Sequence, residues 1–139
     1  MTTRWSHVTI AVLGGVAAAV HVGKVPPALP LLRDELQLDL VAAGCLMGLV
    51  ALMGGLLGLV MGRLADRVTH RRAMILSLVL LTCGSMAGLF AHSAAMLFAS
   101  RIVEGFGLIL AVVAGPALIT SATEARDRGL AFAIWAAWS

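Results

Sequence analysis

The chain has 139 residues, of which 60% are hydrophobic and only 12% charged, and its mean hydropathy is +1.00. A soluble domain of this length has too little interior to bury so much apolar surface, so the composition indicates an integral membrane protein. The net charge of +3 supplies no basic stripe for a nucleic acid. Cys45 and Cys83 both fall within apolar runs, and neither metal-ligand spacing nor a disulfide framework is present. We therefore expect no nucleic-acid partner, metal, cofactor or catalytic residue.

Four apolar runs are long enough to cross a bilayer, at about 5–23, 40–61, 73–91 and 94–119. Each is close to the ~20 residues that an α-helix needs to cross ~30 Å of hydrocarbon. Only helices keep every backbone group hydrogen-bonded within such a span, so the sequence predicts an all-α, polytopic membrane helix bundle. A fifth apolar run begins at about residue 130, and we expect it to be a helix that is cut short.

The links between these runs indicate the topology. In the link 24–39, Pro26, Pro27 and Pro30 are expected to break the helix, and Asp39 is placed to cap the next one. The link at His92 is short, which predicts a tight hairpin. An N-terminus in the cytoplasm would leave Lys24 and Arg33 outside and put the other link cations inside, as the distribution of positive charge in membrane proteins favours; those are Arg4, Arg63, Arg67, Arg71, Arg72, Arg126 and Arg128.

Small residues recur on one face of the second run at steps of three or four. They are Gly44, Gly48, Ala51, Gly55, Gly58 and Gly62. Such a face allows close approach of another helix, either as ordinary bundle packing or as a face that closes on a partner. We interpret Gly44, Gly48, Gly55 and Gly58, with Gly105 on the fourth run, as helix-packing residues, and part of this face as intended for helices outside the chain.

The segment 62–72 is a charge-dense link between two apolar runs, so it must lie at a water-facing surface. It resembles the pattern G-x-L-A-D-R-x-G-R-[RK] of the major facilitator superfamily. Thr69 and His70 stand where that pattern has glycine and arginine, and a threonine is unsuited to the positive φ that a glycine tolerates. The matching residues are Gly62, Leu64, Ala65, Asp66, Arg67 and Arg71. The resemblance implies that Gly62, Asp66, Arg67 and Arg71 form a cytoplasmic gating latch, although arginines that only fix the topology would give a similar cluster.

The fourth run holds two charges well inside the membrane. Arg101 lies about 10 Å along the helix from Ala94, and Glu104 follows at the i+3 position, where the two side chains can face each other. The segment 97–107 resembles a second superfamily pattern, l-x-x-x-R-x-x-q-G-x-g, with Glu104 in place of the usual glutamine. A carboxylate can exchange a proton where an amide cannot. The resemblance thus implies roles in transport and proton coupling for Arg101 and Glu104, and a static pair that orients the helix is the alternative.

Taken together, the two resemblances imply a partial N-terminal half of a twelve-helix major facilitator fold over 1–139. They imply proton-coupled secondary transport of a small-molecule substrate, in the bacterial inner membrane, together with the remaining helices of the same transporter. The chain alone is then expected to be inactive. A split half, a non-transporting membrane interaction protein and a small four-helix dimeric exporter are the alternatives that the sequence leaves open.

Overall fold

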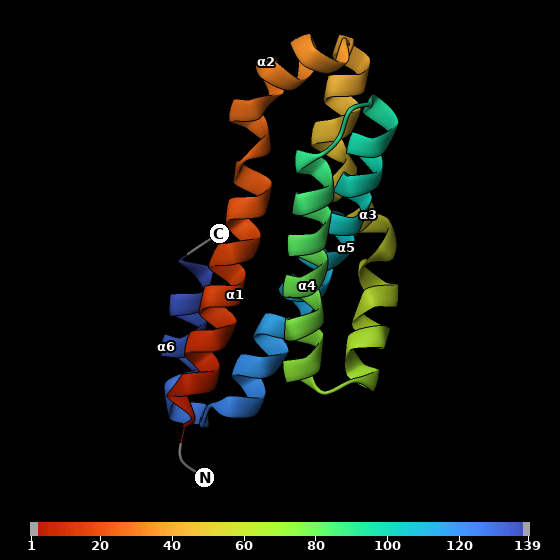
Figure 1. Cartoon of the computed structure of the whole chain (residues 1–139). Helices are drawn as coiled ribbons and strands as arrows, with labels where there is room; N and C mark the ends of the chain where they lie inside the picture. The colour runs from red at the N-terminus through yellow and green to blue at the C-terminus, as the bar shows by residue number, and fades with distance from the viewer. Residues whose placement is uncertain (1–2, 138–139) are drawn as a thin grey trace.

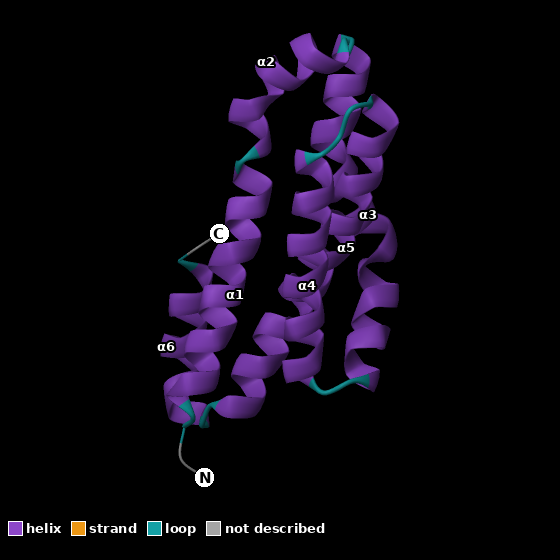
Figure 2. Cartoon of the chain, in the orientation of Figure 1, coloured by secondary structure: helices purple, strands orange, loops and turns teal. Residues whose placement is uncertain are grey.

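The computed structural model describes residues 3–137, except for the side chain of Asp66, and in this part of the chain every regular element is a helix (Figures 1 and 2). The expected all-α fold is confirmed. The six helices are α1 (Trp5–Gly23), α2 (Val25–Leu36), α3 (Leu40–Arg67), α4 (His70–Leu89), α5 (Ala94–Ala122) and α6 (Ala125–Ala136).

Four helical stretches are long and apolar enough to cross a membrane: Trp5–Leu36, Leu40–Ala65, His70–Leu89 and Ala94–Ala122. They run alternately up and down, joined by short links, and α6 returns beside α1 (Figure 1). Helix α5 lies at the centre, where it packs against α1, α3, α4 and α6. Because other helices enclose α5 on several sides, many of its side chains contact protein and not lipid.

The link 24–39 differs from its expected form, because most of it is helical. Lys24 itself has right-handed helical φ and ψ, so α1 continues almost directly into α2. Pro26 and Pro27 occupy the second and third positions of α2. The N–H groups of a first helical turn have no intrahelical partner, so a proline there removes no hydrogen bond. Pro30 lies inside α2. The helix ends at Leu36, and the residue that follows it, Gln37, has the left-handed conformation.

Helix α3 begins where the sequence predicted, and the Asp39 side chain caps it by accepting a hydrogen bond from the backbone N–H of Ala42 at 2.7 Å. Its end was predicted too early, since α3 continues to Arg67 and α4 begins at His70. The charge-dense segment is therefore mostly helix end and helix start, with a link of Val68 and Thr69 alone. Thr69 has φ −64°, so this turn does not need the glycine of the family pattern.

Two glycines bring α4 and α5 unusually close together. A Cβ atom built on Gly107 would lie 2.9 Å from both the backbone nitrogen of Leu81 and the carbonyl oxygen of Ser77. A Cβ atom on Gly84 would lie 2.6 Å from Cγ of Glu104 and 2.8 Å from its backbone nitrogen. Backbone atoms cannot swing aside as the end of a flexible side chain can, so both glycines are needed for this approach.

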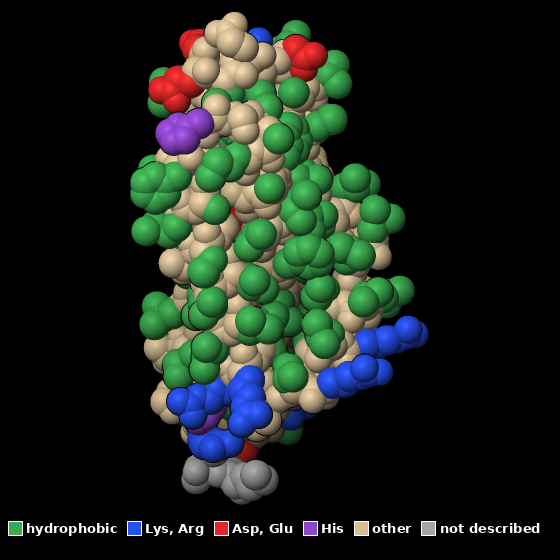
Figure 3. Space-filling view, turned by 45° about the vertical axis from the view of Figure 1, so that its right-hand side comes forward, with side chains coloured by type: hydrophobic (Ala, Val, Ile, Leu, Met, Phe, Trp, Pro, Cys, Tyr) green, Lys and Arg blue, Asp and Glu red, His purple; other side chains and the backbone are tan. Residues whose placement is uncertain are grey.

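The surface of the bundle is divided by charge. Hydrophobic side chains cover the middle, Lys and Arg gather at the lower end, and acidic side chains gather at the upper end (Figure 3). Large apolar side chains such as Leu13, Leu56, Leu59 and Leu89 are more than 60% exposed. A band of this kind suits contact with lipid tails, and the polar ends suit the two membrane surfaces.

Replacing Gly107 by alanine is expected to destabilise the bundle, because the new methyl group would overlap the backbone of α4. Overpacking of this kind costs about 1–3 kcal/mol. The measurement is the melting temperature of the purified chain in detergent, followed by circular dichroism. Gly54→Ala is the matched control, because a Cβ atom at Gly54 would meet nothing within 4 Å. Equal melting temperatures for the two variants would show that the close approach of α4 and α5 is wrong.

Candidate functional site

An ion pair inside the bundle is the starting point of the site. Arg101 and Glu104 are 5% and 3% exposed, and Nη2 of Arg101 contacts Oε2 of Glu104. The expected pairing of these two residues one turn apart on α5 is confirmed. Arg101 also has a buried Nε that finds no hydrogen-bond partner among the described residues. The guanidinium group therefore has one buried N–H donor that is free to bind a further acceptor.

Lys24 is the third member of the site. Its Nζ donates to Oε1 of Glu104 at 2.7 Å and to Oγ of Ser85 at 2.5 Å. Lys24 was expected in an outer link, but it lies at a helical junction between α1 and α2 and its side chain reaches inward. A lysine side chain is long enough to reach inward from the α1–α2 junction while its stem stays in apolar surroundings. The Lys24–Glu104 pair thus joins the first membrane-crossing helix to the central one.

A clue to Lys24 was present in the sequence. Proline is favoured at the first positions of a helix, so Pro26 and Pro27 also suit a helix that starts just after Lys24. That interpretation leaves Lys24 at a helix junction and not in an extended outer link. Its pairing with a residue 80 positions away could not be deduced from spacing, because it depends on how α1 packs against α5.

Helix α4 closes the site on a further side. Ser85 supplies the hydroxyl group that accepts the Lys24 hydrogen bond, and Gly84 lies directly against the Glu104 side chain. On the neighbouring turn, a Cβ atom on Gly88 would lie 3.0 Å from Oγ of Ser100. The small residues of α4 thus leave room for the carboxylate and bring one polar atom to the lysine.

Two hollows border this group of side chains, one of about 70 Å³ and one of about 310 Å³. Arg101 lines both, Glu104 lines the smaller and Lys24 the larger. The other walls are mainly apolar and come from α1, α2, α3, α4 and α5; they include Val25, Leu32, Leu46, Leu81, Leu97 and Leu108. Such a combination of apolar walls and a few convergent polar groups is typical of small-molecule sites. The geometry can hold a small solute beside ionisable side chains.

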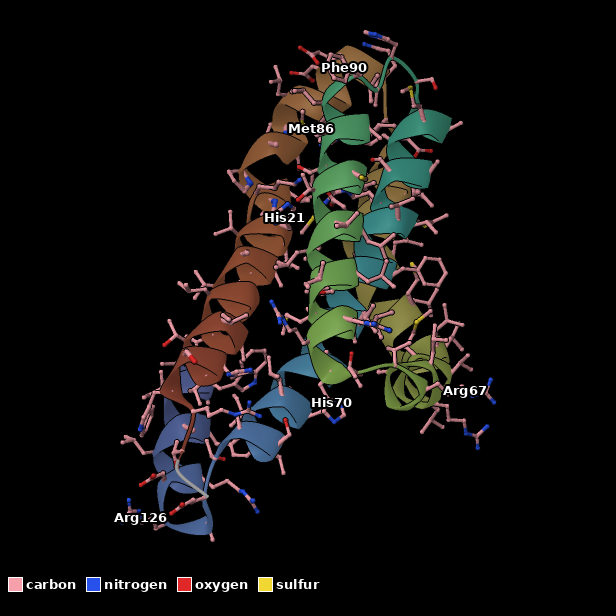
Figure 4. The ribbon with its side chains drawn as sticks, turned by 60° about the horizontal axis from the view of Figure 1, so that its bottom comes forward. His21, Arg67, His70, Met86, Phe90 and Arg126 are labelled. Carbon is pink, nitrogen blue, oxygen red and sulfur yellow. The ribbon has the colours of Figure 1, made fainter. Side chains whose placement is uncertain are left out.

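His21 lies close to this region, on the smaller hollow. Its Nδ1 lies 2.7 Å from the carbonyl oxygen of Ala17, and because a carbonyl can only accept, Nδ1 donates. In Figure 4 His21 lies well away from Arg67 and Arg126, which mark the lower end of the bundle. His21 thus adds a polar ring to the site.

The residues predicted to form the gating latch lie at the lower end of the bundle, far along α3 and α4 from the buried pair. Gly62 and Arg67 belong to the last turns of α3, and Arg71 to the first turn of α4. Arg67 and Arg71 are exposed, and Figure 4 shows Arg67 pointing away from the helices. The Asp66 side chain lies outside the described residues. The structure thus brings Arg67 and Arg71 to one surface of the chain.

The predicted helix-packing glycines fall into two groups. On α3, Gly44, Gly48, Gly55 and Gly58 face open space, since a Cβ atom on any of them would meet nothing within 4 Å. On α5, a Cβ atom on Gly105 would lie 2.8 Å from Sδ of Met53. Within the described residues, only Gly105 of this set therefore lies in a helix–helix contact.

Comparison with known proteins agrees with this architecture. The chain is similar to the Tetracycline resistance protein, class C, of Escherichia coli, with 36% identity over 136 residues that cover 95% of this chain and 34% of that protein. It is also similar to the Methyl viologen resistance protein SmvA of Salmonella typhimurium, with 29% identity over 142 residues that cover 99% of this chain and 28% of that protein. The chain thus spans about a third of the length of these curated relatives, and no solved structure matches it.

A family model provides the wider assignment. The model described as Major Facilitator Superfamily matches residues 8–139, which is nearly the whole chain. With four apolar membrane-crossing stretches and the two sequence patterns on the expected helices, this match shows that the chain belongs to the Major Facilitator Superfamily.

Proposed function

We propose that the chain takes part in secondary active transport of a small organic solute across a membrane, with proton coupling at Glu104. The observation that carries the proposal is the buried group of Lys24, Arg101 and Glu104 beside two hollows. A charged side chain within a membrane-spanning segment costs about 2.5–3.5 kcal/mol on insertion scales, and such residues mark solute and ion pathways. A purely structural helix would pack as well with apolar side chains in these positions.

Glu104 is the group that we assign to the proton. It is the carboxylate of the site, and it is held between two cationic side chains, Lys24 and Arg101. Uptake of a proton removes its negative charge and weakens both ion pairs, so protonation can change how α1 and α5 are held together. A glutamine at this position could make hydrogen bonds but could not carry a proton.

Further helices are part of the proposal. The outward glycine face of α3 offers a surface for close approach, and a hollow of about 420 Å³ lined by Gly54 and Gly58 opens beside it. Gly62, Asp66, Arg67 and Arg71 would then form the cytoplasmic latch to those helices. In this proposal the 139-residue chain contributes one wall of the transport path, and the chain by itself does not transport.

The proposed location is the inner membrane of a bacterium, with the N-terminus in the cytoplasm. The arginines at the lower end of the bundle support this orientation, since cytoplasmic links are rich in Lys and Arg. Lys24 no longer counts toward the outer side, because it faces Glu104 inside the bundle. The charge difference between the two ends is therefore larger than the sequence analysis gave.

The orientation leads to a labelling prediction. In a background of Cys45→Ala and Cys83→Ala, a cysteine at Arg71 should react with a membrane-impermeant maleimide in inside-out vesicles and stay unlabelled in intact spheroplasts. A cysteine at His92 should show the reverse. Both positions are exposed at opposite ends of α4. The opposite pattern of labelling would contradict a cytoplasmic N-terminus.

The proton role leads to a transport prediction. We expect Glu104→Gln, introduced at the chromosomal gene so that all partner helices are present, to abolish the pH dependence of solute flux. Tetracycline and methyl viologen are the first probes, since relatives are named for resistance to them. Flux into inside-out vesicles is measured between about pH 5.5 and 8.

Glu35→Gln is the matched control, because Glu35 is an exposed carboxylate near the end of α2. It should behave like the wild type. A Glu104→Gln variant with an unchanged pH profile would contradict the proton role, and a wild-type protein that moves neither of these probes nor the anion octanoate would contradict transport of small organic solutes. Flux by the 139-residue chain alone would contradict the need for further helices.

A further inference from the structure

We infer that Lys24 and Arg101 form a binding site for an anionic group of the solute, and that this group and a proton on Glu104 bind together. The solute class is then an amphipathic monoanion, such as a carboxylate with an apolar body. The inference rests on the proposed function in that it names the solute of the same site.

The charge balance of the site is the first argument. Lys24 and Arg101 bring two positive charges, and Glu104 brings one negative charge. His21 is the further titratable side chain that lines the smaller hollow. The residues that α3 and α4 contribute to the two hollows carry no charge; they are Leu46, Met47, Val50, Leu81, Ser85, Met86, Gly88 and Leu89. The excess charge of the site is positive, which attracts an anion and repels a cation.

The second argument is an unused donor. Arg101 is only 5% exposed, and it lines both hollows. Its Nε lacks a hydrogen-bond partner among the described residues. A guanidinium group offers five N–H donors in a planar fork that matches a carboxylate. A buried donor of this kind is rarely left unpaired in a folded protein. An anionic oxygen in the hollow would supply the missing acceptor.

The third argument is access. The Lys24 side chain is 36% exposed, although its Nζ contacts Glu104 and Ser85, and it lines the larger hollow. A solute can therefore reach the ammonium group without opening the bundle. The walls around it are apolar, including Val25, Leu32 and Leu97. A small inorganic anion would leave these walls uncovered, whereas the apolar body of an amphipathic solute would bury them.

Glu104 links the solute to the proton. Charged Glu104 forms ion pairs with both Lys24 and Arg101. The carboxylate of a solute must therefore compete with Glu104 for these two cations. In its protonated form it no longer neutralises them, and the site then holds two positive charges. Binding of a proton and binding of the anion consequently strengthen each other, as linked equilibria require.

The test measures binding to the protein purified from its native membrane into neutral-lipid nanodiscs. The probes are octanoate, octanamide and octyltrimethylammonium, which share the same chain length and differ in charge. We expect octanoate to bind more tightly than the other two, and its affinity to rise as the pH falls from 8 to 5.5. Glu104→Gln should raise octanoate affinity at pH 8 by about tenfold and remove its pH dependence, since the competing carboxylate is gone.

Lys24→Gln should weaken octanoate about tenfold, and Lys24→Arg, which keeps the charge, should restore most of the affinity. Neither change should weaken octanamide as much. If Lys24→Gln does not fold, as judged by its melting temperature, the comparison of Glu104→Gln with the wild type decides alone. Tighter binding of octyltrimethylammonium than of octanoate, or an octanoate affinity that Glu104→Gln leaves unchanged, would overturn the inference.

Binding and flux separate this inference from the proposed function. Charge-selective binding of octanoate without any solute flux would support the anion site and contradict transport. Flux that follows pH through Glu104, together with equal binding of all three probes, would support transport and contradict the anion site.

Discussion

The arrangement of this bundle depends on one buried carboxylate. Glu104 lies in the central helix, where a negative charge without partners would be prohibitively unfavourable. Two cations neutralise this charge. Arg101 pairs with Glu104 from the preceding turn of α5, and Lys24 pairs with it from the α1–α2 junction. Pairing within one helix fixes only a side-chain orientation. Pairing with Lys24 ties a second helix to α5, in addition to the buried apolar cluster of Val8, Ala11, Leu118 and Ile119 between α1 and α5.

Glycines on α4 and α5 supply the space that the buried carboxylate and its neighbours need. Gly84 lies so close to Glu104 that any side chain there would displace it, and Gly107 lets the α4 backbone approach α5 a turn further on. Close backbone approach strengthens dispersion contacts and leaves no space for lipid or water beside the carboxylate. The Glu104 side chain is therefore closely covered where it meets Gly84, while α4 also contributes Ser85, Met86 and Gly88 to the wall of the larger hollow.

Much of this architecture follows from sequence patterns, and the remainder depends on tertiary contacts. Apolar run length predicts the four membrane-crossing stretches, Asp39 predicts the start of α3, and i,i+3 spacing predicts the Arg101–Glu104 pair. The prolines after Lys24 were expected to break the helix, but Pro26 and Pro27 lie in the first turn of α2, where proline is tolerated. Lys24 reaches Glu104 only because α1 and α5 are neighbours, and no local pattern encodes a contact 80 residues apart.

The packing of α5 differs on its two sides, and this difference bears on how the site can act. Toward α4, backbone meets backbone through Gly84 and Gly107, so a shift of one helix along the other meets steric resistance. Toward α3, Gly105 meets the sulfur of Met53, a flexible side chain that adapts to a changed surface at small cost. A small displacement is therefore less costly between α3 and α5 than between α4 and α5. In the proposed mechanism, a proton on Glu104 would weaken ion pairs beside both the close α4–α5 contact and the more adaptable α3–α5 contact.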